Sequence, residues 1–417
     1  MKRFLPPAGV RLAATDLFRA SAMLCLGAGE SHKPLNRFSA MLGVKHVFGA
    51  SSGRAAMCVA LRALHSLEPQ RDVVAIPGYT CFSVPAAVVR AGLKLYPLEM
   101  VPETLDIDPR QFDNLPSRRL LCIITANLLG IPSNISEVSR VARVHGAFVL
   151  DDAAQSLGAI RSGQPSGTTA DIGIFSLGRG KPLPAGEGGL VVANSDKIAA
   201  ALGAEIHSLP HCSPTEELTL LAKAIATSIF LSPRLFWIPN SMKFLKLGVT
   251  EFDPAFPITR LSRISRLLLA RLLPSLTTLN QARAIKALQF AGVFEGNSDF
   301  SIPTIADDSQ PTFLRFPLLA KQPSSRDRAV RELCRVGIGA TPFYPTAICD
   351  IPGIAEHMAV PHFHRPQAEG MSRRLLTIPT HRFMRAEDFH RIAVILSQGA
   401  ERVRARRAAG HAAGVTA

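Results

Sequence analysis

The sequence VLDDAAQSLGA, at residues 149–159, shows most directly how this chain folds. It begins with apolar residues typical of a buried strand and then reaches two adjacent carboxylates, Asp151 and Asp152. Ligands of open α/β sheets bind at the carboxyl ends of the strands, so this pair is expected to lie where a ligand binds. The alternative is that an aspartate caps a following helix. Both interpretations can hold, with one aspartate for each.

Strand and helix patterns alternate on the N-terminal side of this stretch. Apolar runs typical of strands include residues 45–50, 72–78, 120–128 and 147–153. Helical patterns separate them, the clearest at residues 51–67. This regular succession predicts an α/β fold in which helices cover both faces of a mostly parallel sheet.

Length and composition describe a globular chain with more than one lobe. Its 417 residues are 47% hydrophobic and 19% charged, which excludes disordered, collagen-like and coiled-coil classes. We expect four segments: an N-terminal leader with one amphipathic helix (1–40), a large ligand-binding domain (41–260) with a helical insertion near 214–250, a helical connection with a small C-terminal α/β domain (261–400), and a disordered basic tail (401–417).

The net charge of +15 favours an anionic partner, which could be nucleic acid, acidic lipid or a phosphorylated small molecule. The aromatic residues are 22 Phe, three Tyr and one Trp, so a base-stacking surface rich in Tyr and Trp is not expected. No nucleic-acid-binding module is recognisable either. We therefore predict no nucleic-acid partner.

The seven cysteines are odd in number, and no two are close enough in sequence for a metal or redox motif. We therefore predict neither a disulfide framework nor a metal site, and we expect a reducing, cytoplasmic location.

The longest apolar stretch, residues 218–231, is too short to span a membrane, which takes about 20 apolar residues. One interpretation is a buried helix followed by a loop at a subunit contact. The other is peripheral membrane contact through residues 218–247, which also contain Trp237, Lys243 and Lys246.

The stretch GASSGRAAMCVAL, at residues 49–61, predicts an anion site. Small residues at a strand-to-helix turn let backbone N–H groups point at an anion, and the helix dipole adds to the attraction. Arg54 lies in the first helical turn, where a cation is unfavourable unless an anion is bound. A solvent-exposed arginine is the alternative.

The stretch IFSLGRGKPLPAGEGGLVV, at residues 174–192, predicts a strand, a glycine-rich turn and a second strand from about Gly189. Lys181 lies in the turn, without a helix around it. Such a lysine suits the Schiff-base amine that the cofactor pyridoxal phosphate requires. A basic loop, or a lysine that only grips phosphate, is the alternative.

Together the three stretches supply, in chain order, a helix N-terminus for a phosphate, a carboxylate for a pyridine nitrogen and a lysine. With DDAAQSLGA and the FS…K…GEGG pattern, the chain resembles the DegT/DnrJ/EryC1/StrS family of pyridoxal-phosphate-dependent nucleotide-sugar aminotransferases, from about residue 40 to 397. The resemblance implies a fold-type I transferase that works as a homodimer. The SLGRGKPL loop resembles a branch associated with bacterial exopolysaccharide synthesis.

The resemblance also implies roles for individual residues. Lys181 would hold the cofactor and move protons, and Asp152 would pair with the pyridine nitrogen. Gln155 would lie near the hydroxyl side of the ring. The residues expected to bind the phosphate are Ser176, Ser52, Gly53 and Arg54. An amino acid, most often glutamate in this family, would give its nitrogen to a keto group of a nucleotide-linked sugar.

The chain departs from the family pattern at several positions. Cys81 replaces a ring-stacking aromatic, Asn127 replaces a histidine, and Arg54 replaces the usual threonine. Gly178, Arg179 and Gly180 stand where His-Pro-Thr is usual. A non-catalytic relative that binds cofactor or sugar nucleotide, as a scaffold or regulator, is therefore the alternative function. Because Lys181 is present, a dehydratase variant with histidine at that position is not expected.

Overall fold

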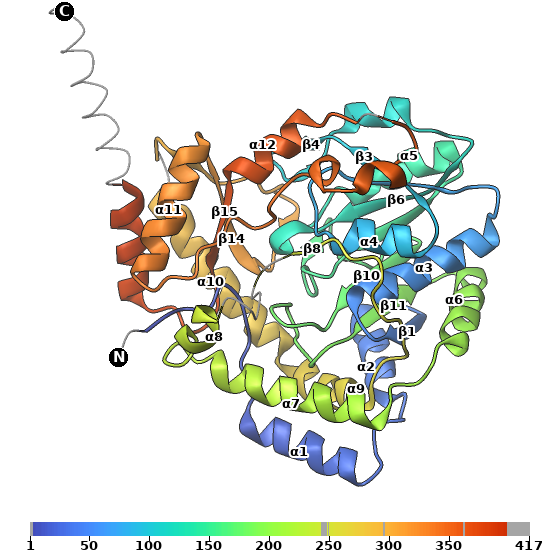
Figure 1. Cartoon of the computed structure of the whole chain (residues 1–417), viewed down its shortest axis with the longest axis horizontal. Coiled ribbons are helices and arrows are strands. Elements are labelled where there is room, and N and C mark those ends of the chain that lie inside the picture. The colour runs from blue at the N-terminus through green and yellow to red at the C-terminus, as the bar shows by residue number, and fades with distance from the viewer. Residues whose placement is uncertain (1–2, 243–247, 249, 295–296, 362, 398–417) are drawn as a thin grey trace, which may run out of the picture.

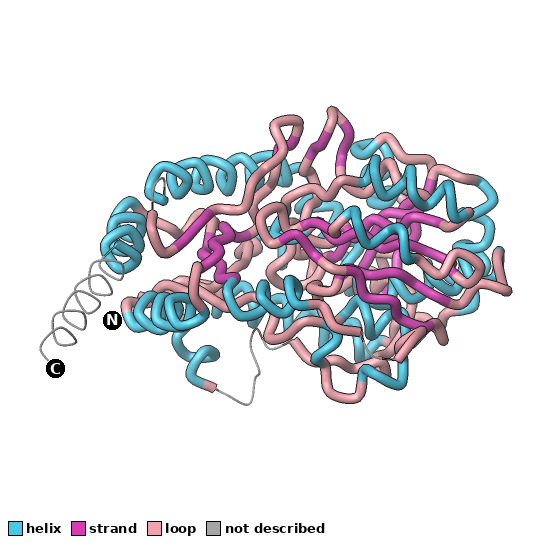
Figure 2. The backbone as a smooth tube through the Cα atoms, turned by 90° about the horizontal axis from the view of Figure 1, so that it is seen from above, coloured by secondary structure: helices cyan, strands magenta, loops and turns pink. Residues whose placement is uncertain are grey.

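A computed structural model describes residues 3–242, 248, 250–294, 297–361 and 363–397. The basic tail, Lys243 and Lys246 lie outside these residues. The chain forms a large lobe around a central sheet and a smaller lobe at its side (Figure 1). Seen from above, the strands of the central sheet run through the large lobe, and a separate group of short strands lies in the small lobe (Figure 2).

The central sheet has seven strands in the order β1-β11-β10-β7-β6-β2-β3. Their bounds are β1 (His46–Ala50), β2 (Val73–Pro77), β3 (Lys94–Leu98), β6 (Leu120–Ala126), β7 (Phe148–Asp152), β10 (Ile172–Ser176) and β11 (Gly189–Ala193). Strands β10, β7, β6, β2 and β3 pair in parallel, whereas β11 is antiparallel to both of its neighbours. The predicted α/β fold with a mostly parallel sheet is thus confirmed.

Helices cover both faces of this sheet. One face packs against α3 (Gly53–Leu67), α4 (Ser83–Arg90) and α6 (Asp196–Ser208). The other packs against α5 (Ile135–His145), α12 (Pro366–Arg374), α2 (Lys33–Leu42) and α9 (Arg263–Leu272). Because both faces are covered, every residue of β2, β6 and β11 is buried.

The small lobe contains an antiparallel sheet of three strands, in the order β12-β14-β15. Its elements are β12 (Phe300–Ser301), β14 (Arg315–Ala320), β15 (Leu375–Pro379), α11 (Pro323–Arg335) and the helical residues 386–397. The long helix α10 (Leu276–Phe294) contributes Phe290 to the core of this lobe, where its ring centroid lies 5.1 Å from that of Phe316. Short strands elsewhere are β4 (Met100–Val101), β5 (Asp106–Ile107), β8 (Ile160–Arg161), β9 (Gln164–Pro165) and β13 (Ser309–Gln310).

The segment expected as a leader is built into the fold. It contains two helices, α1 (Ala14–Cys25) and α2, where the sequence predicted one. Ahead of α1 the chain is extended, and the buried Leu5 donates its backbone N–H to the carbonyl of Gly337 in the small lobe at 2.7 Å. Helix α1 packs against α9, so the N-terminal segment contacts both lobes.

Helix α7 (Pro214–Phe230) lies along the same side of the molecule as α1, and the short α8 (Trp237–Ser241) follows it (Figure 1). The interpretation of 218–231 as a buried helix is wrong for the single chain, since only Glu217, Ala224 and Ser228 of α7 are buried. The side chain of Leu218 is 61% exposed, because α7 covers its neighbours with one face only. Among the described residues, no helix combines the length and the apolar character that a membrane span requires. All seven cysteines are free.

The close approach of β10 to the turn at Gly167 gives a test of packing. A Cβ on Gly173 would overlap the carbonyl oxygen of Gly167. We expect Gly173→Ala to lower the free energy of unfolding by about 1–3 kcal/mol, measured by urea denaturation. The matched control is Gly203→Ala in α6, where the added methyl meets no atom closer than 3.8 Å. Equal stability of the two variants would contradict the packing argument.

Candidate cofactor site

The two aspartates at the end of β7 have different environments. Asp151 is buried, and its Oδ1 accepts hydrogen bonds from Thr125 Oγ1 at 2.8 Å and Asn127 Nδ2 at 2.6 Å. Its Oδ2 accepts one from the backbone N–H of Gly167 at 2.7 Å. The side chain of Asp152 accepts one hydrogen bond, from the backbone N–H of Ala154 at 3.1 Å. Asp151 therefore has a structural role, and Asp152 is the carboxylate left for a ligand.

A turn, and no helix, follows the two aspartates. The helix-capping interpretation is therefore wrong, although Asp152 does cap the turn through Ala154. The network on Asp151 also explains Asn127, which departs from the family pattern. Its amide donates to Asp151, and its Oδ1 accepts from the backbone N–H of Ser133 at 2.7 Å. Asn127 thus fixes the chain just after β6.

The charge of Lys181 acts on the carboxyl group of Asp152. Burial raises the pKa of Asp152 to about 6, and the positive charge of Lys181 counteracts part of this rise. The nearby Asp151 carboxylate raises the pKa slightly further. Asp152 thus lies within the electrostatic reach of Lys181, although 29 positions separate these two residues in the chain.

Ser52, Gly53 and Ser176 lie together at the N-terminus of α3. The Oγ of Ser52 accepts from the backbone N–H of Ala55 at 3.1 Å, which makes Ser52 the N-cap. A Cβ on Gly53 would lie 3.0 Å from the Cβ of Ser176, so the backbone at the start of α3 approaches Ser176 closely. The hydroxyl of Ser176 also accepts from the backbone N–H of Gly178 at 3.3 Å. The hydroxyls of Ser52 and Ser176 at a helix N-terminus fit a phosphate.

Arg54 has protein partners that neither sequence interpretation foresaw. Its guanidinium lies 4.6 Å from the ring centroid of Phe256, and its Nη1 lies 3.7 Å from Asp253 Oδ2. These contacts compensate a cation in the first turn of α3 without requiring a bound anion. A role of Arg54 in binding phosphate stays a prediction.

The sequence did not single out Tyr344, which the small lobe places in the site. The amide Nε2 of Gln155 donates to the Oη of Tyr344 at 2.8 Å, and its Oε1 accepts from the backbone N–H of Leu129 at 3.1 Å. The Oη of Tyr79 accepts from the backbone N–H of Tyr344 at 3.1 Å. Two of the three tyrosines in the chain therefore meet at the lobe junction. That scarcity was the sequence signal that could have indicated them.

Tyr344 also lies near two other residues of the site. Burial raises the pKa of Tyr344, and the charges of Cys81 and Asp152 raise it further. Cys81, which replaces the usual aromatic, is partly exposed and contacts Ser83 Oγ at 3.4 Å. Tyr344 thus brings an aromatic ring near Cys81, where this chain lacks the aromatic of the family pattern.

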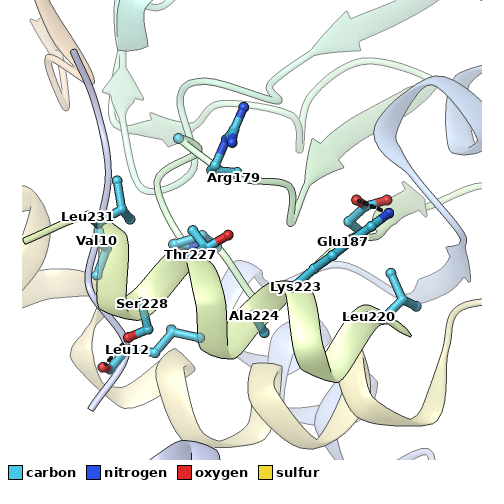
Figure 3. Close-up of a pocket in the computed structure, with 13 residues that line it drawn as sticks. Val10, Leu12, Arg179, Glu187, Leu220, Lys223, Ala224, Thr227, Ser228 and Leu231 are labelled. Atoms are coloured by element: carbon cyan, nitrogen blue, oxygen red, sulfur yellow. Dashed lines mark hydrogen bonds and ion pairs between the residues drawn. The ribbon is translucent and has the colours of Figure 1, made fainter. Parts of the chain in front are cut away.

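A groove of about 480 Å³ borders the outer side of the lysine loop. It lies between this loop, α7 and the extended N-terminal segment, as Figure 3 shows. Its lining includes Arg179 and Gly180, next to Lys181, and the ion pair of Lys223 with Glu187 at 3.8 Å. Asp152, Gln155 and Ser176 do not line it, so this groove is separate from the carboxylate and phosphate positions.

Comparison with known proteins agrees with this geometry. The profile of the DegT/DnrJ/EryC1/StrS aminotransferase family matches residues 26–211 and 257–397. The chain belongs to this family. The assignment makes the protein a sugar aminotransferase and indicates pyridoxal phosphate as its cofactor. The residues gathered around Asp152 fit that cofactor, because they provide a carboxylate, a lysine and a phosphate position.

The chain is similar to several characterised proteins. It is 27% identical to a UDP-N-acetyl-3-dehydro-alpha-D-glucosamine 3-aminotransferase of Acidithiobacillus ferrooxidans, over 85% of this chain and 84% of that protein. It is 24% identical to the lipopolysaccharide biosynthesis protein RfbH of Salmonella typhimurium, over 78% and 75%. The solved structure of Helicobacter pylori PseC, an aminotransferase involved in the biosynthesis of pseudoaminic acid, has the same fold, with a TM-score of 0.76 and 18% identity over 95% of this chain and 99% of that one.

The raised pKa of Asp152 predicts a pH dependence of stability in the cofactor-free protein. The unfolded carboxyl ionises near its ordinary value of 3.8, but the folded one ionises near 6. Between these values the folded state binds more protons, so its free energy of unfolding falls as the pH rises. In the wild type, the free energy of unfolding should therefore decrease between pH 4 and 6.5, as measured by urea denaturation. We expect this decrease to be about 1–2 kcal/mol smaller in Asp152→Asn.

Asp72→Asn is the matched control. Arg119 holds the pKa of Asp72 below its ordinary value, so the stability that this pair contributes is lost only at lower pH. This variant should therefore keep the wild-type slope between pH 4 and 6. A wild-type slope in Asp152→Asn would show that Asp152 does not carry the effect.

Proposed function

We propose that this protein transfers an amino group from an amino acid, with glutamate as the first candidate, to a keto group of a nucleotide-linked sugar for surface or exopolysaccharide biosynthesis. The observation that carries the proposal is a buried Asp152 within electrostatic reach of Lys181, together with the close approach of Gly53 to Ser176 at the start of α3. Support for the substrate comes from the relative that acts on a UDP-linked sugar. Support for the polysaccharide role comes from the lipopolysaccharide biosynthesis relative and from the lysine-loop resemblance.

The cofactor supplies an electron sink for the carbanion formed at the reacting carbon. Ser52, Gly53 and Ser176 would hold its phosphate, with Arg54 near the same turn. The carboxylate of Asp152 would accept a hydrogen bond from the ring N–H and keep that nitrogen protonated. The Nζ of Lys181 would hold the cofactor between turnovers and then move the proton at the reacting carbon of each substrate.

Gln155 would serve the hydroxyl side of the ring. Its Nε2 has two N–H groups, and Tyr344 accepts one of them, so the second is left for that hydroxyl. Its Oε1 is already bound by the backbone N–H of Leu129, which fixes the direction of the amide. Gln155 therefore links the cofactor position to the small lobe through Tyr344.

The alternative function is a non-catalytic relative that binds cofactor or sugar nucleotide as a scaffold or regulator. Loss of the lysine or of the carboxylate would favour it. Both residues are present, and they lie close enough for Lys181 to influence the pKa of Asp152. This proximity favours the enzyme.

The protein is further proposed to act as a cytoplasmic homodimer that uses the outer face of α7. Leu218, Ile225 and Ile229 of this helix are exposed in the single chain. Other residues of the same helix, among them Leu220 and Ala224, line the groove between α7 and the lysine loop (Figure 3). A membrane surface is the competing partner for the same residues. Support for a reducing compartment comes from the odd number and wide spacing of the seven cysteines in the sequence.

The first half-reaction tests the enzymatic proposal. Purified protein supplied with pyridoxal phosphate should show the yellow absorbance of lysine-bound cofactor, and glutamate should convert it to the aminated form. Lys181→Ala should show neither the yellow band nor the conversion, because it lacks the amine that holds the cofactor. The control is Lys286→Ala, which removes a lysine that lies 5.4 Å from the Phe389 ring in the small lobe. Normal conversion by Lys181→Ala would contradict the assignment.

A double variant tests the assembly. Leu218→Glu with Ile225→Glu places charges on the outer face of α7 and should shift the protein from dimer to monomer in analytical ultracentrifugation. Val144→Glu on α5, where the side chain is 76% exposed, is the matched control and should stay dimeric. A wild-type monomer that floats with phosphatidylglycerol vesicles, and loses this binding in the double variant, would favour the membrane instead.

A further inference from the structure

We infer that Arg315, the first residue of β14, binds the carboxylate of the amino donor. No motif in the sequence points to this residue, and it lies in the small lobe, far along the chain from Lys181. The inference rests on the proposed aminotransferase function and extends it to the substrate side of the site. Four observations carry it: the face of the strand, the anchoring of its start, the unpaired charge, and the neighbours of that charge.

The alternation of side chains along β14 directs Arg315 toward the large lobe. Phe316, Leu318 and Ala320 belong to the core of the small lobe, so they share one face of the strand. Leu319 belongs to the opposite face and packs in the cluster that contains Tyr344 and the large-lobe residues. Since successive side chains of a strand alternate, Arg315 lies on the same face as Leu319.

Two backbone hydrogen bonds anchor the start of β14 at the carboxyl edge of the central sheet. The N–H of Thr312 donates to the carbonyl of Gly130 at 3.0 Å, and the N–H of Leu314 donates to that of Leu129 at 2.8 Å. Leu129 and Gly130 form the turn directly after β6. Arg315 is therefore held at the end of the sheet where Asp152 lies.

The guanidinium of Arg315 has little compensation from protein groups. Its Nη1 donates to Thr341 Oγ1 at 2.9 Å, and within the described ranges no carboxylate lies within 4.0 Å of it. Burial lowers the pKa of Arg315 to about 10, an effect that Tyr344 partly opposes. An arginine offers five N–H donors, so most of them are left for a ligand. The side chain is still partly exposed, which leaves a path for that ligand.

The buried Arg283 is better satisfied by protein groups than Arg315. Arg283 also has a pKa lowered by burial, yet it donates to Asn280 Oδ1 at 2.7 Å and to the carbonyl of Pro182 at 3.1 Å. These bonds fix α10 to the lysine loop, which is a structural role. Arg315 makes no comparable bridge, so its position is better explained by an anion that arrives with a substrate.

The location of Arg315 favours a carboxylate over a diphosphate. The α-carboxylate of an amino acid is attached directly to the reacting carbon, so it must lie next to the lysine and the cofactor ring. The diphosphate of a nucleotide sugar is separated from the reacting carbon by the sugar ring. Tyr344 interacts electrostatically with both Asp152 and Arg315, and the anchoring of β14 to the turn after β6 holds Arg315 at the same edge of the sheet as Asp152. The planar guanidinium also matches a carboxylate in two parallel hydrogen bonds.

Arg315→Gln and Arg315→Lys test the inference, with Arg328→Gln as the matched control in the same lobe. The guanidinium of Arg328 lies 3.4 Å from Asp299 Oδ2, outside the site. The donor half-reaction is followed by absorbance against the concentration of L-glutamate, or of another amino acid to which the wild type responds. Binding of glutarate, an unreactive dicarboxylate, is measured by calorimetry.

We expect Arg315→Gln to lower kcat/KM for the donor by about 10- to 100-fold, mostly through KM, and to weaken glutarate binding by a similar factor. The kcat/KM and the glutarate affinity of Arg315→Lys should lie between those of Arg315→Gln and the wild type. Lysine keeps the positive charge but loses the planar pair of N–H donors that matches a carboxylate. Affinity for pyridoxal phosphate and the circular dichroism spectrum should not change. Arg328→Gln should behave as the wild type in all these measurements.

Wild-type donor kinetics in folded Arg315→Gln would overturn the inference, and so would an effect confined to the half-reaction with a nucleotide-linked sugar. The second result would assign the arginine to a sugar carboxylate or a phosphate. If Arg315→Gln does not fold, Arg315→Lys decides, and wild-type values would refute the role. Failure of the proposed function is distinct, because the wild type would then react with no amino acid, and glutarate binding would still test Arg315.

Discussion

The hydrogen bonds to the Asp151 carboxylate are the constraint on which the site depends. Thr125, Asn127 and Gly167 bind its two oxygens from three different segments. A buried carboxylate without such donors would be strongly destabilising, so this network fixes β6, β7 and the turn at Gly167 relative to one another. With Asp151 held in this way, the next residue, Asp152, is placed at the carboxyl edge of the sheet with most of its hydrogen-bonding capacity unused.

A second set of contacts joins the two lobes at this edge. Gln155 donates to Tyr344, Tyr79 accepts from the backbone of the same residue, and the start of β14 bonds to the turn after β6. The small lobe thereby becomes part of the site and brings an aromatic ring and a cation to it. The family pattern places an aromatic where this chain has Cys81, and Tyr344 provides a ring nearby.

Much of the fold could be predicted from local sequence. The alternation of apolar runs and helical patterns indicated the strands on both sides of Asp151, and each was found in the central sheet. The antiparallel pairing of β11 could not be predicted, since Gly189–Ala193 has the same apolar character as its parallel neighbours. The exposure of α7 was also missed, because an apolar stretch does not reveal whether another element covers it.

The sequence by itself determined the α/β class and the family, and it supplied the residues proposed to hold pyridoxal phosphate, since these depend on local periodicity and on short motifs in a fixed order. Only the tertiary structure decided which aspartate is structural, which partners Arg54 has, and that Tyr344 and Arg315 belong to the site. These features depend on contacts between residues far apart in the chain, such as Gln155 with Tyr344. Hydrogen bonding and burial across such distances leave no periodic pattern in a single sequence.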